Sequence, residues 1–398
     1  MSRIDTKTQV LEIGALLIVG SIPISQFLSV RILFLLLIVS LIIRRVKYSN
    51  LFKQSWDILL FLLILGLGII YSEDKISALR VLETNFSFLA IPIVFNVIKP
   101  AKRNLYSLLI SFISGVLIAS MICIGFAIYR YTKSLDSSFF LFETLMDIVG
   151  IQPTYFAYYL CFSLTLSLYF LYYRELAVSK YILTLVSIFL FIILMLTAGR
   201  TAYISMLLVF AFFILKFLFE ESRSIEKRQV FILSVTFLVS MLFINSLNLN
   251  VDASHINEST DYWERIELWK AALNSSKNWF FGVGTGDFDQ LNDYYLSHGL
   301  TSFAQENLNS HNQFLQSFFT NGMLGVLSVL ILIIRPIYLS IRHEHVLGTL
   351  VFFPFIVYGI TEVFLGRYQG VVFFALIHQL FISYYYNVAS LSVKKSDI

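Results

Sequence analysis

The chain has 398 residues, of which 58% are hydrophobic, 16% aromatic and 14% charged, and its formal net charge is +4. Soluble domains carry about 25% charged residues, so this composition excludes an ordinary soluble protein and indicates a polytopic membrane protein. The apolar runs are nearly continuous and do not alternate with polar residues, which favours transmembrane helices over barrel strands. The small positive charge requires no nucleic-acid partner.

Windows of about 20 apolar residues predict about 12 transmembrane helices along the chain. These windows centre on residues 9–27, 29–43, 56–71, 84–98, 105–129, 150–173, 181–198, 201–219, 230–247, 312–334, 347–365 and 370–390. The sequence shows no internal repeat and no dividing linker, so we expect residues 1–398 to form one polytopic membrane domain. The predicted fold class is therefore all-α and integral to the membrane.

The distribution of basic residues predicts how the chain lies in the membrane. An even number of helices places both termini on one side. With both termini in the cytoplasm, 19 of the 29 Lys and Arg residues, Arg335 among them, fall on the cytoplasmic side, which follows the positive-inside rule. Residues 248–311, the one long polar stretch, then form a large extracytoplasmic loop. Loops of this length are usually functional or disordered, and this one is not of low complexity.

Arg200 interrupts an apolar stretch that runs from residue 181 to residue 219. The stretch is too long for one transmembrane helix and fits two, so we expect Arg200 in an outer turn over Thr197–Thr201. An arginine at mid-bilayer would cost about 2.5–3.5 kcal/mol, which also favours the turn. There its guanidinium fork could clamp a phosphate, although a residue that anchors the chain at the interface is the alternative interpretation.

His311 lies where the long polar stretch ends and a strongly apolar run begins. Ser310 and Gln313 form a Ser-x-x-Gln pattern, which predicts a helix start with His311 in the first turn. Unpaired N–H groups at a helix start favour an anion and a neutral imidazole, so His311 is a candidate base beside a phosphate. A polar residue that caps the helix at the water boundary is the alternative.

Other motifs carry less information. Arg265, on a predicted helix over residues 262–277, and Arg80, in an outer segment, could each contact an anionic head group. The glycines at 282, 284 and 286 lack the Gly-Lys-Ser/Thr of a phosphate-binding loop. The Asp-x-Asp at residues 287–289 is short and common by chance. The histidines and the two cysteines lack the spacing of a zinc site, so we expect no metal site.

The segment from residue 311 to residue 325 resembles a known pattern. His311-Asn312, nine residues and then Gly322-Met323-Leu324-Gly325 are similar to the His-[Asn/Ser/Gln]-x9-Gly-x-x-[Gly/Thr/Tyr] pattern of bacterial O-antigen ligases. Arg265, Trp269 and Gly282-Val283-Gly284, together with the Thr-Ala-Gly-Arg200 turn, also resemble the shared core of the O-antigen ligase and polymerase superfamily. This resemblance covers about residues 197–326.

The resemblance implies a GT-C-like fold and an inverting, metal-independent glycosyltransferase without a cofactor. The implied donor is a glycan on undecaprenyl pyrophosphate at the outer face of the bacterial inner membrane, and the implied acceptor is a sugar hydroxyl, as on the lipid A core. Within this resemblance His311 orients or deprotonates the acceptor, and Arg200 and Arg265 bind the pyrophosphate and stabilise the charge that develops on it. We expect Arg80, Asn312 and Gly284 as possible further substrate contacts.

Three alternatives remain open. A polymerase would use a second lipid-linked glycan as its acceptor, and the sequence does not separate it from a ligase. A transporter with 12 transmembrane helices would usually show internal repeats and ionisable groups near mid-bilayer. Here few such groups are expected, His378 being the clearest. A non-catalytic scaffold would not need Arg200, Arg265 and His311 together. These comparisons favour the glycosyltransferase.

Overall fold

The computed structural model describes residues 6–43, 48–98, 102–176, 178–197, 199–221, 224–246, 262–276 and 278–396. Within these ranges every regular element is a helix, which confirms the predicted all-α class. The chain folds into two compact units. The first comprises Met1–Ile18, Ser29–Leu108 and Thr260–Ile398, and the second comprises Val19–Leu28 and Leu109–Ser259. Of the predicted extracytoplasmic loop, residues 248–261 and residue 277 lie outside the described ranges.

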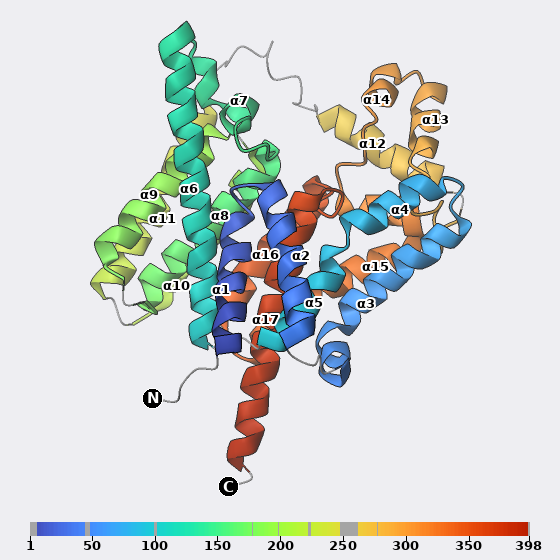
Figure 1. Ribbon diagram of the computed structural model, residues 1–398. Coiled ribbons are helices and arrows are strands. Elements are labelled where there is room, and N and C mark those ends of the chain that lie inside the picture. The colour runs from blue at the N-terminus through green and yellow to red at the C-terminus, as the bar shows by residue number, and fades with distance from the viewer. Residues whose placement is uncertain are drawn as a thin grey trace. The chain divides into compact units, whose positions relative to one another are not determined.

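The first unit holds most of the helices (Figure 1). They are α2 (Gln26–Ile43), α3 (Tyr48–Tyr71), α4 (Lys75–Thr84), α5 (Ser87–Ile98), α12 (Tyr262–Ser275), α13 (Asp289–Ser297), α14 (Thr301–Gln305), α15 (Gln313–Arg342), α16 (Val346–Thr361) and α17 (Tyr368–Ser396). The second unit contains α6 (Lys102–Ser134), the short helices η1 (Ser137–Phe140) and α7 (Phe142–Met146), then α8 (Pro153–Tyr173), α9 (Lys180–Leu196), α10 (Arg200–Phe219) and α11 (Ile225–Ser246). Helices α1 (Thr6–Ser21), α2 and α6 are each divided between the units.

Every predicted membrane window coincides with a helix, because a segment in lipid must satisfy its own backbone hydrogen bonds. Seven helical segments of the described chain are long and apolar enough to cross a membrane: Tyr48–Tyr71, Lys75–Ile98, Asn104–Ser134, Pro153–Tyr173, Thr201–Phe219, Gln313–Arg342 and Tyr368–Val388. Four shorter apolar helices and α11 account for the other windows. The chain is therefore a multi-pass membrane protein.

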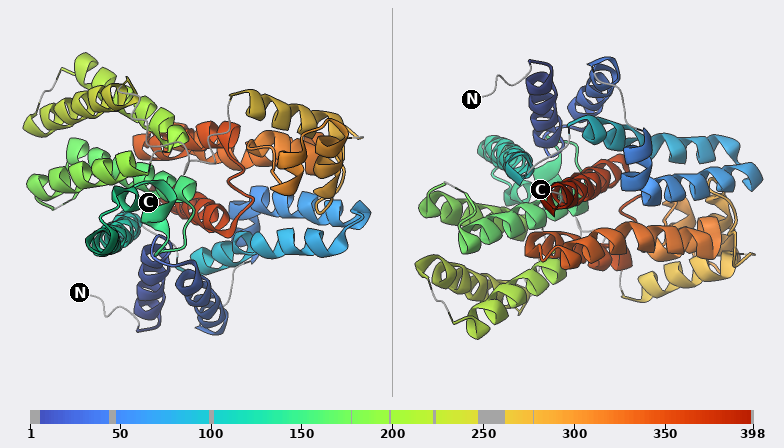
Figure 2. Two further views of the ribbon diagram at one scale, coloured as in Figure 1. Left: turned by 90° about the horizontal axis from the view of Figure 1, so that it is seen from above. Right: turned by 90° about the horizontal axis from the view of Figure 1, so that it is seen from below.

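Helix α15 is the element around which the first unit packs. It contacts α3 and α16, and α12 packs against it as well. Both views of Figure 2 show α3 and α4, in blue, beside α15, in orange. In Figure 1 the three helices of the loop region, α12, α13 and α14, lie together close to α4. Leu268, Ala271 and Tyr295 form a buried cluster with Phe319 of α15, so the loop helices are anchored on α15.

Three ionisable side chains are buried where α3, α15 and α17 meet. Asp57 pairs with Arg335 through Oδ1, and its Oδ2 lies 2.8 Å from His378 Nε2. The prediction that Arg335 lies in a cytoplasmic loop was wrong, because Arg335 lies within α15 and its side chain is only 9% exposed. Its guanidinium also donates to the carbonyls of Lys53 and Gln54, beside a kink in α3 at Ser55. These partners explain how a charged residue tolerates the helix interior.

In the second unit, the apolar stretch from residue 181 to residue 219 forms two helices, as predicted. Helix α9 ends at Leu196 and α10 begins at Arg200. Both helices pack against α8, nearly all of whose residues are buried. Phe112 of α6 packs edge-on against Tyr159 and Phe162 of α8. A central helix that is apolar on every side is thus enclosed by its neighbours.

Candidate functional site

The beginning of α15 differs from the predicted capping box. The N-cap is Asn312 and not Ser310, because Asn312 Oδ1 accepts the N–H groups of Phe314 and Leu315 at 2.9 and 3.0 Å. Ser310 is also engaged: its N–H donates to Gln316 Oε1 and its hydroxyl donates to the Asn312 carbonyl. His311 consequently precedes the helix and does not belong to its first turn.

His311 is held in an unusual backbone conformation and faces a carboxylate. Its φ of 44° lies in the left-handed region, and its N–H donates to Asn309 Oδ1 at 2.8 Å. Its Nδ1 lies 3.5 Å from Glu362 Oε2, and the two side chains are 26% and 23% exposed. A carboxylate beside Nδ1 favours the tautomer that carries its proton there, which leaves Nε2 as the basic nitrogen. Sequence reasoning missed Glu362; the available signal was a carboxylate directly after an apolar helix.

Arg265 contacts the residue that precedes Glu362. Its Nη1 donates to the carbonyl of Thr361 at 3.3 Å, and Thr361 is the last residue of α16. A guanidinium at a helix C-terminus is stabilised by the unpaired carbonyls and by the helix dipole. Arg265 of α12 and His311, which precedes α15, therefore contact consecutive residues although they lie far apart in the sequence.

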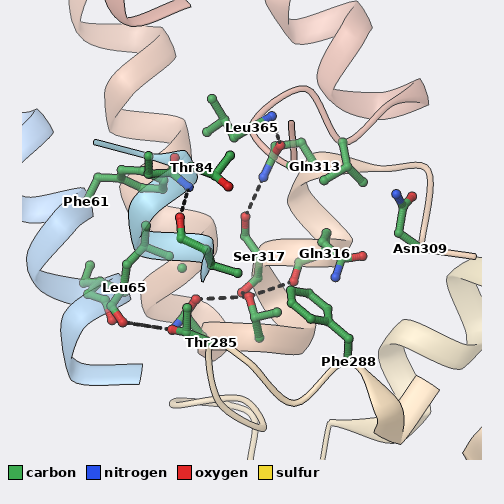
Figure 3. Close-up of a pocket in the computed structure, with 18 of the residues that line it drawn as sticks. Phe61, Leu65, Thr84, Thr285, Phe288, Asn309, Gln313, Gln316, Ser317 and Leu365 are labelled. Carbon is green, nitrogen blue, oxygen red and sulfur yellow. Dashed lines mark hydrogen bonds between the residues drawn. The ribbon is translucent and has the colours of Figure 1, made fainter. Parts of the chain in front are cut away.

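Gln313 fixes the connection between α16 and α17 beside His311. Its Oε1 accepts the N–H of Leu365 at 2.8 Å, and its Nε2 donates to Ser317 Oγ at 3.1 Å. The connection that carries Glu362 is thus held to α15 by its own backbone, as Figure 3 shows for Leu365 and Gln313. The hydrogen bond between Leu365 and Gln313 therefore limits how far Glu362 can move from His311.

A pocket of about 370 Å³ begins beside His311, where Asn309 and Gln313 line it. Its walls come from α3, α4, α15 and residues 363–366, and Figure 3 shows Phe61, Gln316 and Phe288 around it. Arg80 alone is charged among the described residues that line the pocket.

Helix α4, which carries Arg80, is capped by Asp74. The Asp74 carboxylate accepts the N–H groups of Ile76 and Ser77. Hydrogen bonds from the Ser77 side chain and backbone lower the pKa of Asp74.

The glycines of the resemblance pattern shape a kink in α15. Asn321 and Gly322 leave helical geometry, Gly322 with a φ of 61° and a ψ of −154°. The kink frees backbone groups that pair with the preceding loop: Val283 N–H donates to the Phe319 carbonyl and Gly284 N–H to the Thr320 carbonyl, both at 2.9 Å. A side chain at Gly322 would collide with the Phe280 carbonyl group. The kink therefore accepts the loop as a hydrogen-bonded partner and requires glycine.

The loop over residues 282–287 is enclosed on its other side by the turn that follows α3. A Cβ at Gly284 would lie 2.8 Å from Ser72 Cα. Asp287 accepts hydrogen bonds from the Ser72 hydroxyl at 2.7 Å and from the N–H groups of Glu73 and Asp74 at 3.0 and 2.8 Å. Asp287, the first residue of the Asp-x-Asp pair, thus stabilises the turn that follows α3.

Two of the expected substrate contacts are engaged within the protein. The Gly284 N–H donates to Thr320, and the Asn312 side-chain oxygen caps α15. Arg200 is the first residue of α10 in the second unit, and its side chain lies outside the described part of the structure. In the structure Arg265 and His311 contact the neighbouring residues Thr361 and Glu362. That Arg200 lies near them stays a prediction.

Fold and site together define an all-α integral membrane protein with a cluster of shorter helices, α12, α13 and α14, and with a His–Glu pair and an arginine that meet beside a pocket. Residues 185–330 match the model of the O-antigen ligase family. This confirms the resemblance identified from the sequence. The matched range includes Arg200, Arg265, His311 and the two glycines of the pattern.

A curated relative comes from Haemophilus influenzae and is described there as an uncharacterized protein. It is 25% identical over 130 residues, which are 30% of this chain. The matched stretch spans only about a third, 33%, of that relative's length.

Proposed function

We propose that the protein is a glycosyltransferase that moves a glycan from undecaprenyl pyrophosphate to a sugar hydroxyl, as an O-antigen ligase does on the lipid A core. The observation that carries this proposal is the pairing of His311 with Glu362 directly beside the contact of Arg265 with Thr361. A base and a guanidinium are the two groups that transfer from a diphosphate requires.

The proposed base is His311 Nε2, with Glu362 as the residue that orients the ring. The acceptor oxygen attacks the anomeric carbon of the donor as its proton passes to Nε2, and the bond from that carbon to the diphosphate oxygen breaks. The electron pair of the broken bond leaves with undecaprenyl pyrophosphate. Attack from the side opposite the leaving group inverts the anomeric carbon in one step.

The proposed role of Arg265 and Arg200 is to neutralise the departing diphosphate. One of the five guanidinium N–H groups of Arg265 donates to Thr361, which fixes the side chain and leaves donors for a ligand. Charge supplied in this way replaces the proton that a general acid would otherwise deliver to the leaving group. No metal ion and no cofactor is required in this scheme.

The proposed location is the bacterial inner membrane, with both termini in the cytoplasm and the site at the outer face. The excess of basic residues on the cytoplasmic side supports this orientation. The clustering of α12, α13 and α14 on α15 supports a folded extracytoplasmic loop that carries Arg265 and leads to His311.

The transporter alternative draws on one observation, the buried group of Asp57, Arg335 and His378. These three side chains pair with one another, and Arg335 lies near the opposite end of α15 from His311. Both oxygens of Asp57 are therefore paired without a transported ion, and the family match favours glycan transfer.

The test is deletion of the gene in its host, followed by complementation and electrophoresis of the surface polysaccharide. Loss of all long chains from the lipid A core would identify a ligase, and a core that carries a single repeat unit would identify a polymerase. His311→Ala should fail to restore the long chains although membrane levels of the protein are normal. The matched control is His298→Ala, since His298 is an exposed histidine that stacks on Tyr294. A fully active His311→Ala protein would refute the mechanism.

A further inference from the structure

The polar groups that line the pocket beside His311 fall into two sets. In the first set, hydrogen bonds within the protein satisfy the side chains: Asn321 Nδ2 donates to Thr285 Oγ1 at 3.0 Å, and Thr285 Oγ1 donates to the Leu65 carbonyl at 2.9 Å. Figure 3 shows Thr285 and Leu65 at this end of the pocket. These groups form the wall and have no need of a ligand.

The second set consists of two buried amide atoms. Gln316 is 6% exposed and Asn85 is 2% exposed, and both residues line the pocket. Gln316 Oε1 accepts the Ser310 N–H, but Gln316 Nε2 makes no hydrogen bond within the described chain. Asn85 Nδ2 donates to the Val81 carbonyl, and Asn85 Oδ1 is likewise left without a partner there. The pocket lining thus contains one buried donor and one buried acceptor that have no partner within the described chain.

These two atoms restrict the chemistry of a ligand. A polyprenyl chain could pair with neither, so both amides would remain unsatisfied. An ionised diphosphate only accepts hydrogen bonds, so it could pair with Gln316 Nε2 but not with Asn85 Oδ1. A hydroxyl group both donates and accepts, and a sugar ring carries several such groups at fixed angles. The apolar side chains of Phe61, Phe288 and Val363 suit the C–H face of such a ring.

We propose that this pocket is a sugar-binding subsite in which Gln316 Nε2 donates to, and Asn85 Oδ1 accepts from, the hydroxyl or acetamido groups of one sugar ring. The inference rests on the proposed function, because Asn309 and Gln313 connect the pocket to His311. The ring can belong to the glycan of the donor or to the acceptor, since both carry the same chemistry. Arg80, the charged residue of the lining, would face an acidic substituent of the ring.

The test measures sugar binding separately from transfer. Purified full-length protein in nanodiscs is mixed with methyl glycosides of hexoses and N-acetylhexosamines, and saturation-transfer NMR reports which of them bind. We expect Gln316→Leu and Asn85→Leu each to weaken binding about three- to tenfold, the loss of one neutral hydrogen bond. Gln305→Leu is the control, since Gln305 is an exposed amide of α14.

Two further variants guard against misfolding. Gln316→Glu keeps the oxygen that accepts the Ser310 N–H but removes the free donor, so it should bind as poorly as Gln316→Leu. Asn85→Asp keeps the acceptor oxygen but loses the Nδ2 group that donates to the Val81 carbonyl, so it should bind sugar better than Asn85→Leu and less well than the unaltered protein. Absence of glycoside binding, unchanged binding by both leucine variants, or displacement of the glycosides by inorganic pyrophosphate would each overturn the proposal.

Competition identifies the source of the sugar. Displacement of the glycoside by a glycan-loaded undecaprenyl pyrophosphate, but not by the bare lipid, assigns the ring to the donor; displacement only by an acceptor glycan assigns it to the acceptor. His311→Ala should bind the glycosides normally, because His311 does not line the pocket. Normal glycoside binding together with an unchanged surface polysaccharide after deletion of the gene would refute the proposed function and leave the sugar subsite intact.

Discussion

Replacing Glu362 with glutamine should slow glycan transfer about tenfold and leave the KM for the donor nearly unchanged. Glu362 contacts His311 and does not line the pocket, so its loss affects the base more than substrate binding. A hydrogen bond to a charged group contributes about 1.5–3 kcal/mol. The 3.5 Å separation exceeds ordinary hydrogen-bond length, and both side chains are about a quarter exposed. The contribution of this pair therefore falls at the lower end of that energy range. About 1.4 kcal/mol corresponds to a factor of ten in rate.

The assay is transfer from a purified lipid-linked glycan by the full-length protein in proteoliposomes, with kcat and KM determined separately. Glu362→Asp should recover part of the lost rate, because it restores the carboxylate at a greater distance. Glu306→Gln is the matched control, since Glu306 is an exposed carboxylate that, like Glu362, directly follows a helix of the first unit. A merely structural role for Glu362 would lower protein yield and thermal stability without this partial recovery by aspartate.

A rate for Glu362→Gln equal to that of the unaltered protein, measured beside an inactive His311→Ala protein, would refute the reasoning. It would show that the imidazole acts without an orienting carboxylate. A rise in KM at constant kcat would instead place Glu362 in contact with substrate.

The other predictions concern charge, backbone and burial. Arg265→Lys and Arg200→Lys should each reduce the transfer rate at least about tenfold, because lysine keeps the charge and loses the fork; normal rates would make these residues interface anchors. Gly322→Ala should destabilise the protein by about 1–3 kcal/mol in thermal unfolding, since its backbone conformation is nearly confined to glycine. Its control is Gly66→Ala, where a Cβ meets open space, and an equal effect of both would contradict the argument. Asp57→Leu should cost roughly 3–5 kcal/mol, because Arg335 would remain buried without its partner; an unchanged unfolding temperature would show that the pair is dispensable.

The start of α15 shows how far sequence patterns reach. The change from polar to apolar residues placed the helix boundary within three residues of its true position, because burial in lipid demands a continuous apolar helix. The cap itself was predicted wrongly. Ser310 and Asn312 can both cap a helix. In the fold, Ser310 pairs with Gln316, and Gln313, the other half of the predicted capping box, pairs with Leu365, so the cap is Asn312. Local propensity left several solutions open, and tertiary contacts selected one.

The sequence by itself determined the class of the protein, the position of its membrane helices and the turn between α9 and α10. Each follows from a local requirement, since apolar side chains and internally paired backbones are needed wherever the chain crosses lipid. The tertiary structure alone decided that His311 meets Glu362, that Arg265 meets the end of α16, and that Arg335 is buried against Asp57, 278 residues away. Such pairs join segments distant in the chain, and they depend on how helices pack and not on the composition of either segment.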